Sequence, residues 1–202
     1  MALMQLDTGA VLQGTFALHR VNLMLVFQVN CPGCLSQALP QLETIQHRFP
    51  ALNCFALSSA FEDFGLNNQA NTEKLLHEGV MPLASARHFS RLGHALLPYK
   101  ITVPVLMDRF ADVEQMEAFY QSARRLLGET GLNQTLTDQT QQLLSQRLQP
   151  LLLSGRTFLN NQLQGTPSWC LFDDAMQIID QWFGHRPLEW IEAHVAVAMG
   201  TG

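Results

Sequence analysis

One stretch of the sequence decides the fold: Leu23-Met24-Leu25-Val26-Phe27-Gln28-Val29-Asn30-Cys31-Pro32-Gly33-Cys34. Its five leading apolar residues predict a strand over about 22–28 that is buried on both faces, as in a parallel sheet. Apolar residues then recur at three- and four-residue spacing, which predicts a helix over about 32–48. Pro40 lies inside that helix and is expected to bend it, because proline lacks the amide donor. The two cysteines therefore lie where a strand passes into a helix.

The elements on either side extend this stretch into an α/β domain. A second apolar run over 52–57 predicts another strand, so that strand, helix and strand form a parallel βαβ unit. Near the C-terminus, strands over 168–172 and 176–183 are close enough to pair as an antiparallel hairpin. Further expected elements are helices over 72–78 and 84–97, an extended piece over 101–106 with Pro104 at an edge or strand start, irregular chain over 151–164, and a last helix from Pro187 to about Met199. The sequence predicts a central mixed sheet flanked by helices.

Residues 109–150 have a different pattern. Asp112 and Gln115 form a capping box, an apolar stripe follows, and Gly128 is a good helix stop. A second helix is expected over about 137–149. These features predict a helical hairpin inserted into the α/β frame. It either packs onto the domain, shields the active site, or offers a surface to a partner or to a second copy in a homodimer.

The composition excludes several classes of protein. The 202 residues suit a single domain over 1–202, and 47% of them are hydrophobic, as in ordinary globular proteins. Only 14% are charged and the net charge is −5, so a nucleic-acid partner is not expected. No apolar run approaches the roughly 18 residues of a membrane span. The first seven residues lack the basic and apolar regions of a signal peptide, so a cytoplasmic location is expected.

The chemistry centres on Cys31 and Cys34. Unpaired amides and the helix dipole stabilise an anion at a helix N-terminus, which lowers the pKa of a thiol there. Two intervening residues bring both sulfurs onto one turn, within reach of a disulfide. Cys31 is the expected attacking thiol, and Cys34, further into the helix, is the expected resolving thiol. The other two cysteines, Cys54 and Cys170, lie in apolar strands and are expected to be core residues.

Two other interpretations of the pair remain open. The pair could be half of a zinc site, although no second C-x-x-C exists and His88 and His94 lie in a different segment. It could also be two inert buried thiols, which the helix-start position disfavours. No metal and no cofactor are predicted.

Gly165-Thr166-Pro167 precedes a strand and carries two equal interpretations on local sequence alone. Proline is ordinary at the start of a strand. Alternatively, the tripeptide is a cis-proline loop that faces the cysteine pair and offers backbone atoms to a substrate peptide.

The chain resembles the thioredoxin-like superfamily, and within it the TlpA-like and AhpC/TSA-like redoxin branch. The resemblance covers about 12–108 and 160–199 and leaves the hairpin outside. It implies a thioredoxin-like fold, a nucleophilic Cys31, a resolving Cys34 and a cis-proline at Pro167. It also places the substrate against Pro32, Gly33, Thr166 and Pro167. It is carried, in order, by Leu25-Val26-Phe27 leading to Cys31-Pro32-Gly33-Cys34, the bent helix with Pro40, the segment Val103-Pro104-Val105-Leu106-Met107-Asp108, and Gly165-Thr166-Pro167 before a strand hairpin.

The sequence also departs from the pattern of these families. Asn30 stands where thioredoxins usually have tryptophan, and Leu25 and Gln37 stand at the two familiar positions of a proton-shuttling acid. Glu62 is the candidate proton-transfer residue in their place, with Asp63 beside it as the other acid, although solvated loop acids are the simpler interpretation of both. Gln28 occupies the position where the peroxidase members need threonine or serine, which disfavours peroxide chemistry.

The predicted function is that of a thiol-disulfide oxidoreductase that uses Cys31 and Cys34 as a dithiol/disulfide couple. Its expected partners are a protein or small-molecule disulfide and a reductant of unknown identity. The alternatives are a thiol peroxidase, and a non-catalytic module that binds metal or docks a partner through 109–150.

Overall fold

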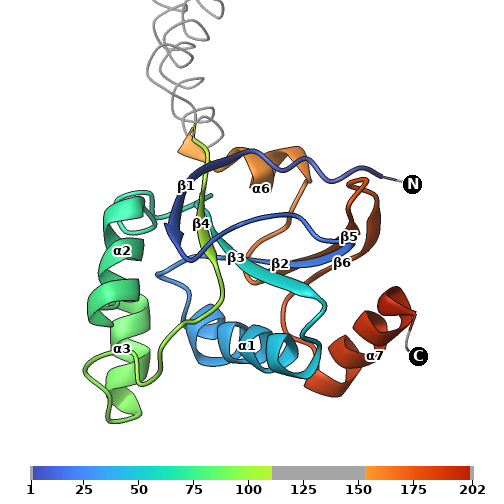
Figure 1. The fold of residues 1–202 in the computed structure, drawn as a ribbon. Helices are drawn as coiled ribbons and strands as arrows, with labels where there is room; N and C mark the ends of the chain where they lie inside the picture. Colours follow the sequence, from blue (N-terminus) through green and yellow to red (C-terminus); the bar gives the residue numbers. More distant parts are fainter. Residues whose placement is uncertain (1, 111–152, 201–202) are drawn as a thin grey trace, which may run out of the picture.

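The computed structural model describes residues 2–110 and 153–200, and within them a mixed six-stranded sheet forms the centre of the fold (Figure 1). The strand order is β1-β4-β3-β2-β5-β6. The parallel pairs are β2 with β3 and β3 with β4, whereas β1, β5 and β6 run antiparallel to their neighbours. The strands are β1 (Thr8–Gln13), β2 (Val21–Phe27), β3 (Asn53–Ser58), β4 (Val105–Asp108), β5 (Ser168–Asp173) and β6 (Ile178–Phe183).

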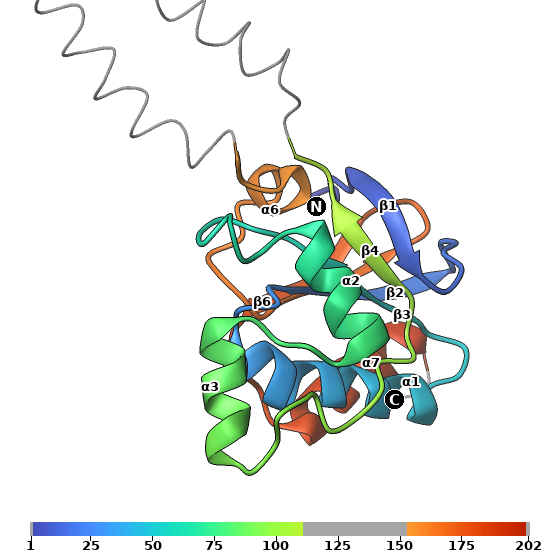
Figure 2. The same ribbon diagram turned by 90° about the vertical axis from the view of Figure 1, so that its left-hand side faces the viewer.

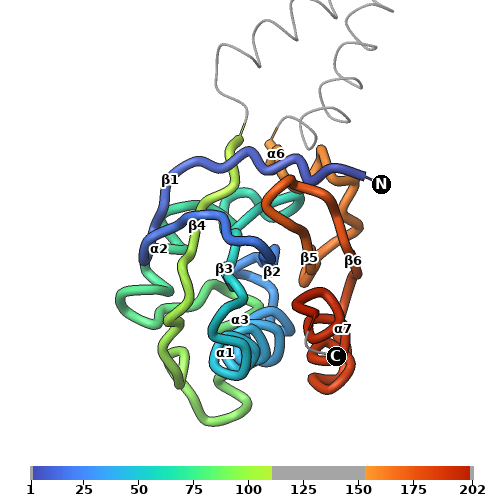
Figure 3. The backbone as a smooth tube through the Cα atoms, turned by 45° about the vertical axis from the view of Figure 1, so that its right-hand side comes forward, coloured from blue at the N-terminus to red at the C-terminus, as the bar shows by residue number. Residues whose placement is uncertain are grey.

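Helices cover both faces of the sheet. In Figure 1, α1 and α7 lie below the sheet, α6 lies above it, and α2 and α3 lie to the left of α1; Figure 2 shows α2 and α3 in front. The tube in Figure 3 leads from β5 and β6 into α7, which lies beside α1. The helices are η1 (Cys34–Ala38), α1 (Leu39–Arg48), α2 (Gln69–Glu78), α3 (Leu83–Arg91), α6 (Arg156–Asn160) and α7 (Leu188–Met199).

The central strand β2 explains why the apolar run at the start of the chain is uninterrupted. All seven of its residues are buried, because both faces of the sheet are covered. Leu23 and Leu25 pack in the core between the sheet and the helices α1 and α7. Met24 and Val26 point to the opposite face and pack in a second core, between the sheet and α6 with the N-terminal segment. The thioredoxin-like fold predicted from the sequence is confirmed.

The bend expected at Pro40 takes the form of a π-helical turn. The amide of Leu39 donates to the carbonyl of Cys34, five residues earlier, across η1. Pro40, which has no amide to donate, then lies in the first turn of α1. The helix that carries the cysteine pair is therefore wider at its start than an α-helix.

Several expectations about the remaining elements were wrong in detail. Strand β1 was not expected; it lies at an edge of the sheet and its pairing with β4 is irregular, so its sequence lacks the pattern of a buried strand. The segment expected to be irregular contains α6, whose five residues are too few to show a helical period. Helix α3 ends at Arg91, earlier than expected. In contrast, Pro104 directly precedes β4, which agrees with the expected strand start, although β1 covers the outer side of β4.

The predicted helical hairpin lies almost wholly outside the described residues, because they stop at 110 and resume at 153. The two elements on either side of this segment, β4 before it and α6 after it, are joined by hydrogen bonds. The buried carboxylate of Asp108 accepts hydrogen bonds from the Ser59 hydroxyl (2.7 Å) and from the amides of Thr157 (2.9 Å) and Phe158 (3.2 Å). These bonds fasten the end of β4 to the start of α6.

Candidate functional site

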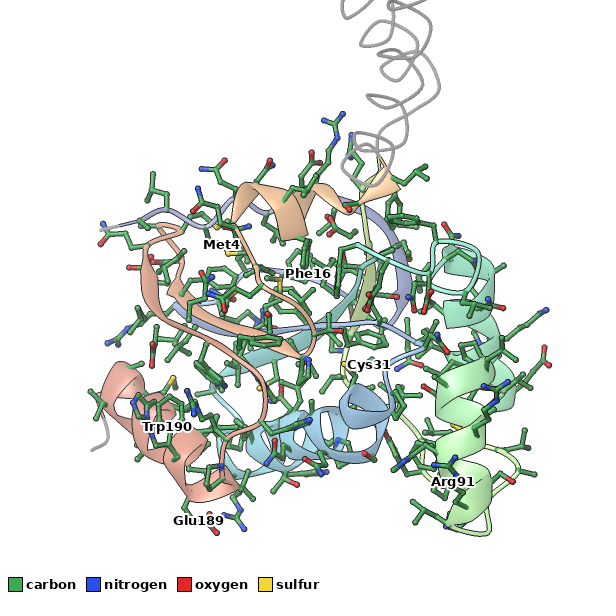
Figure 4. The ribbon with its side chains drawn as sticks, turned by 180° about the vertical axis from the view of Figure 1, so that it is seen from behind. Met4, Phe16, Cys31, Arg91, Glu189 and Trp190 are labelled. Carbon is green, nitrogen blue, oxygen red and sulfur yellow. The ribbon has the colours of Figure 1, made fainter. Side chains whose placement is uncertain are left out.

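The two cysteines lie on one turn at the end of the loop that follows β2. The sulfurs of Cys31 and Cys34 are 2.6 Å apart, and the amide of Cys34 lies 3.3 Å from the Cys31 sulfur. Cys31 is partly exposed, whereas Cys34 is fully buried against the core. Figure 4 shows Cys31 at the point where the helix η1–α1 begins. The structure thus presents one thiol to solvent and holds the second directly behind it.

The surroundings of the two sulfurs shift their pKa values in opposite directions. The pKa of Cys31 is lowered to about 7, first by the hydrogen bond from the Cys34 thiol and also by the backbone amides of Cys34 and Gly33, while burial acts in the opposite direction. The pKa of Cys34 is raised well above its ordinary value, because burial removes its sulfur from water and because the hydrogen bond to Cys31 and the negative charge of ionised Cys31 both disfavour a second thiolate. Near neutrality, Cys31 is therefore the thiol of the pair that ionises more readily.

Alkylation of the reduced protein by iodoacetamide is therefore expected to follow the ionisation of Cys31. Since its pKa is lowered, the rate at Cys31 should be high at pH 8 and should fall as the pH drops through about 7. Measuring the rate against pH by mass spectrometry of the modified peptide tests this. The control is the urea-unfolded protein, whose thiols should show a midpoint of the alkylation rate at pH ~8.5. A midpoint for folded Cys31 at or above that of the unfolded chain would contradict the assignment.

The loop before β5 faces the cysteine pair. The peptide bond between Thr166 and Pro167 is cis, and the Thr166 carbonyl oxygen lies 3.7 Å from the Cys31 sulfur. The Thr166 hydroxyl donates to the side-chain oxygen of the buried Gln28 (3.1 Å), the residue that stands at the position of the peroxidase threonine. Gln28 thereby holds the loop in register with the end of β2.

Asn30 has a structural task that the sequence did not reveal. Its backbone amide donates to Asn67 (2.9 Å), its side-chain amide donates to Asp63 (2.9 Å), and its side-chain oxygen accepts from the amide of Ala84 in α3 (2.8 Å). Asp63 has a positive φ of 47°, a conformation that aspartate tolerates better than most residues. The residue before Cys31 thus ties the loop after β3 and the start of α3 to the site.

Cys31 opens into a surface cavity of about 350 Å³. Glu62 and Asp63 lie on its wall, and Phe61 and Phe183 add aromatic surface. Glu62 is exposed, and among the described residues no hydrogen bond joins its carboxylate to either sulfur, so its role in proton transfer stays a prediction. The lining residues are Gln28, Asn30, Cys31, Pro32, Phe61, Glu62, Asp63, Asn67, Gln164, Gly165, Thr166 and Phe183.

The other side of the cysteine turn is covered by the loop between β6 and α7. A Cβ atom added to Gly33 would lie 2.7 Å from Nε2 of His185, so the imidazole occupies the space that a side chain at position 33 would need. His185 is exposed and comes from a loop more than 150 positions along the chain. No sequence signal pointed to it, because only the pairing of β5 with β6 brings this loop to Gly33.

The remaining two cysteines are core residues, as predicted. Both are fully buried, Cys54 in the core that contains Cys34 and Cys170 in the core on the opposite face of the sheet. Burial raises the pKa of Cys170 to about 12 and that of Cys54 above its ordinary value, so both thiols stay protonated at neutral pH.

Over 2–110 and 153–200, no three His, Cys, Asp or Glu residues are grouped so that they could hold a metal ion. Among these same residues, no helix has the length and apolar character needed to cross a membrane.

The fold and the paired cysteines define a protein of the thioredoxin-like fold, and solved structures agree. A crystal structure of a thioredoxin-like superfamily protein matches with a TM-score of 0.57 and 20% identity, over 98% of this chain and 97% of its own. A thiol-disulfide isomerase from Corynebacterium glutamicum matches with a TM-score of 0.57 and 18% identity, over 99% and 94%. A thioredoxin-like protein in its oxidised form matches with a TM-score of 0.51 and 12% identity, over 98% and 95%. No protein-family model and no curated protein sequence matches the chain.

Proposed function

We propose that the protein is a thiol-disulfide oxidoreductase with Cys31 and Cys34 as its redox couple. The observation that carries the proposal is the geometry of the pair: an ionisable, partly exposed sulfur 2.6 Å from a buried one, at the start of a helix. The similarity to a thiol-disulfide isomerase supports it. At the position where the peroxidase members need threonine or serine, Gln28 stands instead, and its side-chain oxygen accepts a hydrogen bond from the Thr166 hydroxyl; we therefore favour disulfide exchange over reduction of peroxide.

The proposed reaction has two exchange steps. The Cys31 thiolate attacks one sulfur of a substrate disulfide, the substrate bond breaks, and its second sulfur leaves as a thiolate. Cys34 then attacks the Cys31 side of the mixed disulfide and releases the remaining substrate sulfur. The proton of Cys34 ends on a product thiol, and two electrons pass from the Cys31–Cys34 pair to the substrate. An external dithiol or thiol of the compartment restores the reduced pair.

The loop at Thr166 is proposed to hold the substrate chain beside Cys31. Its carbonyl oxygen lies 3.7 Å from the attacking sulfur, and Pro32 lines the same cavity, whereas His185 stands against Gly33. A substrate backbone placed in this cavity could pair with the loop as an added strand does. In a reducing compartment, electrons would flow from the protein to its substrate.

Replacing Cys34 by serine is expected to stop the reaction after its first step. The reduced Cys34→Ser variant, treated with bis(2-hydroxyethyl) disulfide, should accumulate a mixed disulfide at Cys31, because no resolving thiol remains. Intact-mass measurement detects the adduct, and peptide mapping locates it. Cys54→Ala, a variant of a buried cysteine outside the pair, should turn over like the unaltered protein. An adduct that forms on Cys54 or Cys170, or no adduct at all, would contradict the proposed roles.

A further inference from the structure

The cavity beside Cys31 has an uneven distribution of charge. Two of its lining residues, Glu62 and Asp63, carry carboxylates, and none of its lining residues is Lys, Arg or His. Because the Cys31 sulfur opens into the same cavity, any substrate that reacts there must bring its disulfide next to these two carboxylates. The charge on the substrate near its reactive sulfur therefore affects binding directly.

The loop that carries the carboxylates is held in place. Asn67 is buried. Its side-chain amide donates to the backbone carbonyl of Glu62 (3.0 Å), and its backbone amide donates to the backbone carbonyl of Asp63 (2.9 Å). One carboxylate oxygen of Asp63 accepts from the side chain of Asn30, the residue directly before Cys31. The Asp63 carboxylate is thus held beside the residue that precedes Cys31, and the backbone that carries Glu62 is held in place by Asn67.

The basic groups of the region lie on another side of the cysteine turn. His185 stands against Gly33, and the guanidinium of Arg186 lies 5.5 Å from the ring centre of Trp190 on α7. Neither residue lines the cavity. The two carboxylates therefore have no basic side chain beside them among the residues that line the cavity, and Phe61 and Phe183 add aromatic surface to the same lining.

We propose that this cavity selects disulfides that carry a positive charge close to the reactive sulfur. The shared chemistry is an ammonium or guanidinium group a few bonds from the disulfide, in a small amine disulfide or in a peptide with Lys or Arg beside its cysteine. The inference rests on the proposed function, since it concerns the substrate of the same thiol. Disulfides that carry carboxylates at that position should react slowly, because like charges repel.

The test compares three aliphatic disulfides of similar size that differ in charge: cystamine, bis(2-hydroxyethyl) disulfide and 3,3′-dithiodipropionate. Rates of the reduced protein are divided by rates of dithiothreitol with the same disulfide, which removes intrinsic differences in reactivity. The corrected rate should be about 10-fold higher for the cationic than for the anionic disulfide at low salt, and the ratio should shrink at 0.5 M salt. Peptide disulfides with Lys or Glu beside the cysteine should show whether the same preference holds for peptides.

Three variants identify the source of the preference. Glu62→Gln and Asp63→Asn should each lower the cationic-to-anionic ratio by about 2- to 3-fold. Asparagine tolerates the positive φ at position 63 and retains an oxygen acceptor for Asn30. Glu189→Gln is the control, because it removes one negative charge from the start of α7, far from Cys31 in Figure 4, and should leave the ratio unchanged.

The outcomes separate the two claims. If the reduced protein exchanges with none of the three disulfides, the proposed function fails and the inference fails with it. If it reacts with the neutral disulfide but its cationic-to-anionic ratio equals that of dithiothreitol, only the inference is overturned. A preference that survives both acid substitutions, or that falls equally in Glu189→Gln, also overturns it. The ratio is used because a loss of proton transfer in Glu62→Gln would lower all three rates together.

Discussion

Replacing Cys31 by serine is expected to lower the rate of disulfide exchange by roughly 1,000-fold or more, because a serine hydroxyl does not ionise near neutral pH. Cys34 cannot take over the attack. It is fully buried, and its raised pKa keeps the sulfur protonated. The measurement is the rate at which dithiothreitol reduces bis(2-hydroxyethyl) disulfide in the presence of the protein, compared with the rate in its absence.

The matched control for this variant is Cys54→Ala, which removes a thiol from the same core without touching the pair. It should retain activity within a few-fold of the unaltered protein. A Cys31→Ser protein that keeps more than a tenth of the activity would show that another group is the nucleophile. The circular dichroism spectrum of each variant separates loss of chemistry from loss of fold.

Replacing Gly155 by alanine is expected to give the largest loss of stability. A Cβ atom there would overlap the Asp108 carboxylate and the Ser59 hydroxyl, which are both buried. The overlap would displace the carboxylate from the amides of Thr157 and Phe158 that it now accepts from. Forced overpacking of this kind costs about 2–3 kcal/mol, which is roughly 5–10 °C in Tm for a chain of this length.

The control for Gly155→Ala is Gly65→Ala, because nothing lies within 4 Å of a Cβ atom built on Gly65. The free energy of unfolding of that variant should lie within about 0.5 kcal/mol of the value for the unaltered protein. Thermal and urea unfolding followed by circular dichroism measures both. Equal stability of the two variants would show that the junction between β4 and α6 is more adaptable than its hydrogen bonds suggest.

The central part of the fold was predictable because its signals are local. The apolar run that became β2 is continuous, since the strand is buried on both faces, and the cysteine pair follows it directly. Pro40 was expected to bend the helix, and the structure has the π-helical turn η1 directly before the first turn of α1, which contains Pro40. Strand β1 and helix α6 gave no such signal, because one is an irregular edge strand and the other has five residues.

The parts of the site that were not predicted depend on contacts between distant segments. Asn30 was recognised only as a departure from the usual tryptophan, although its amide joins Asp63 and Ala84 to the site. His185 reaches Gly33 from the far end of the chain. No local sequence pattern around either residue predicts its contact with a distant segment. The cavity and its charge therefore could not be predicted, because they depend on how the loops after β2, after β3 and before β5 lie around Cys31.

The central claim is that Cys31 and Cys34 form a reversible dithiol/disulfide couple. The most direct measurement is equilibration of the protein with a series of oxidised and reduced dithiothreitol mixtures, followed by alkylation and peptide mapping. The account predicts a two-electron transition in which Cys31 and Cys34 lose their free thiols together, while Cys54 and Cys170 remain reduced throughout. A protein whose Cys31 and Cys34 stay free across the whole series, or become oxidised separately, would contradict the account.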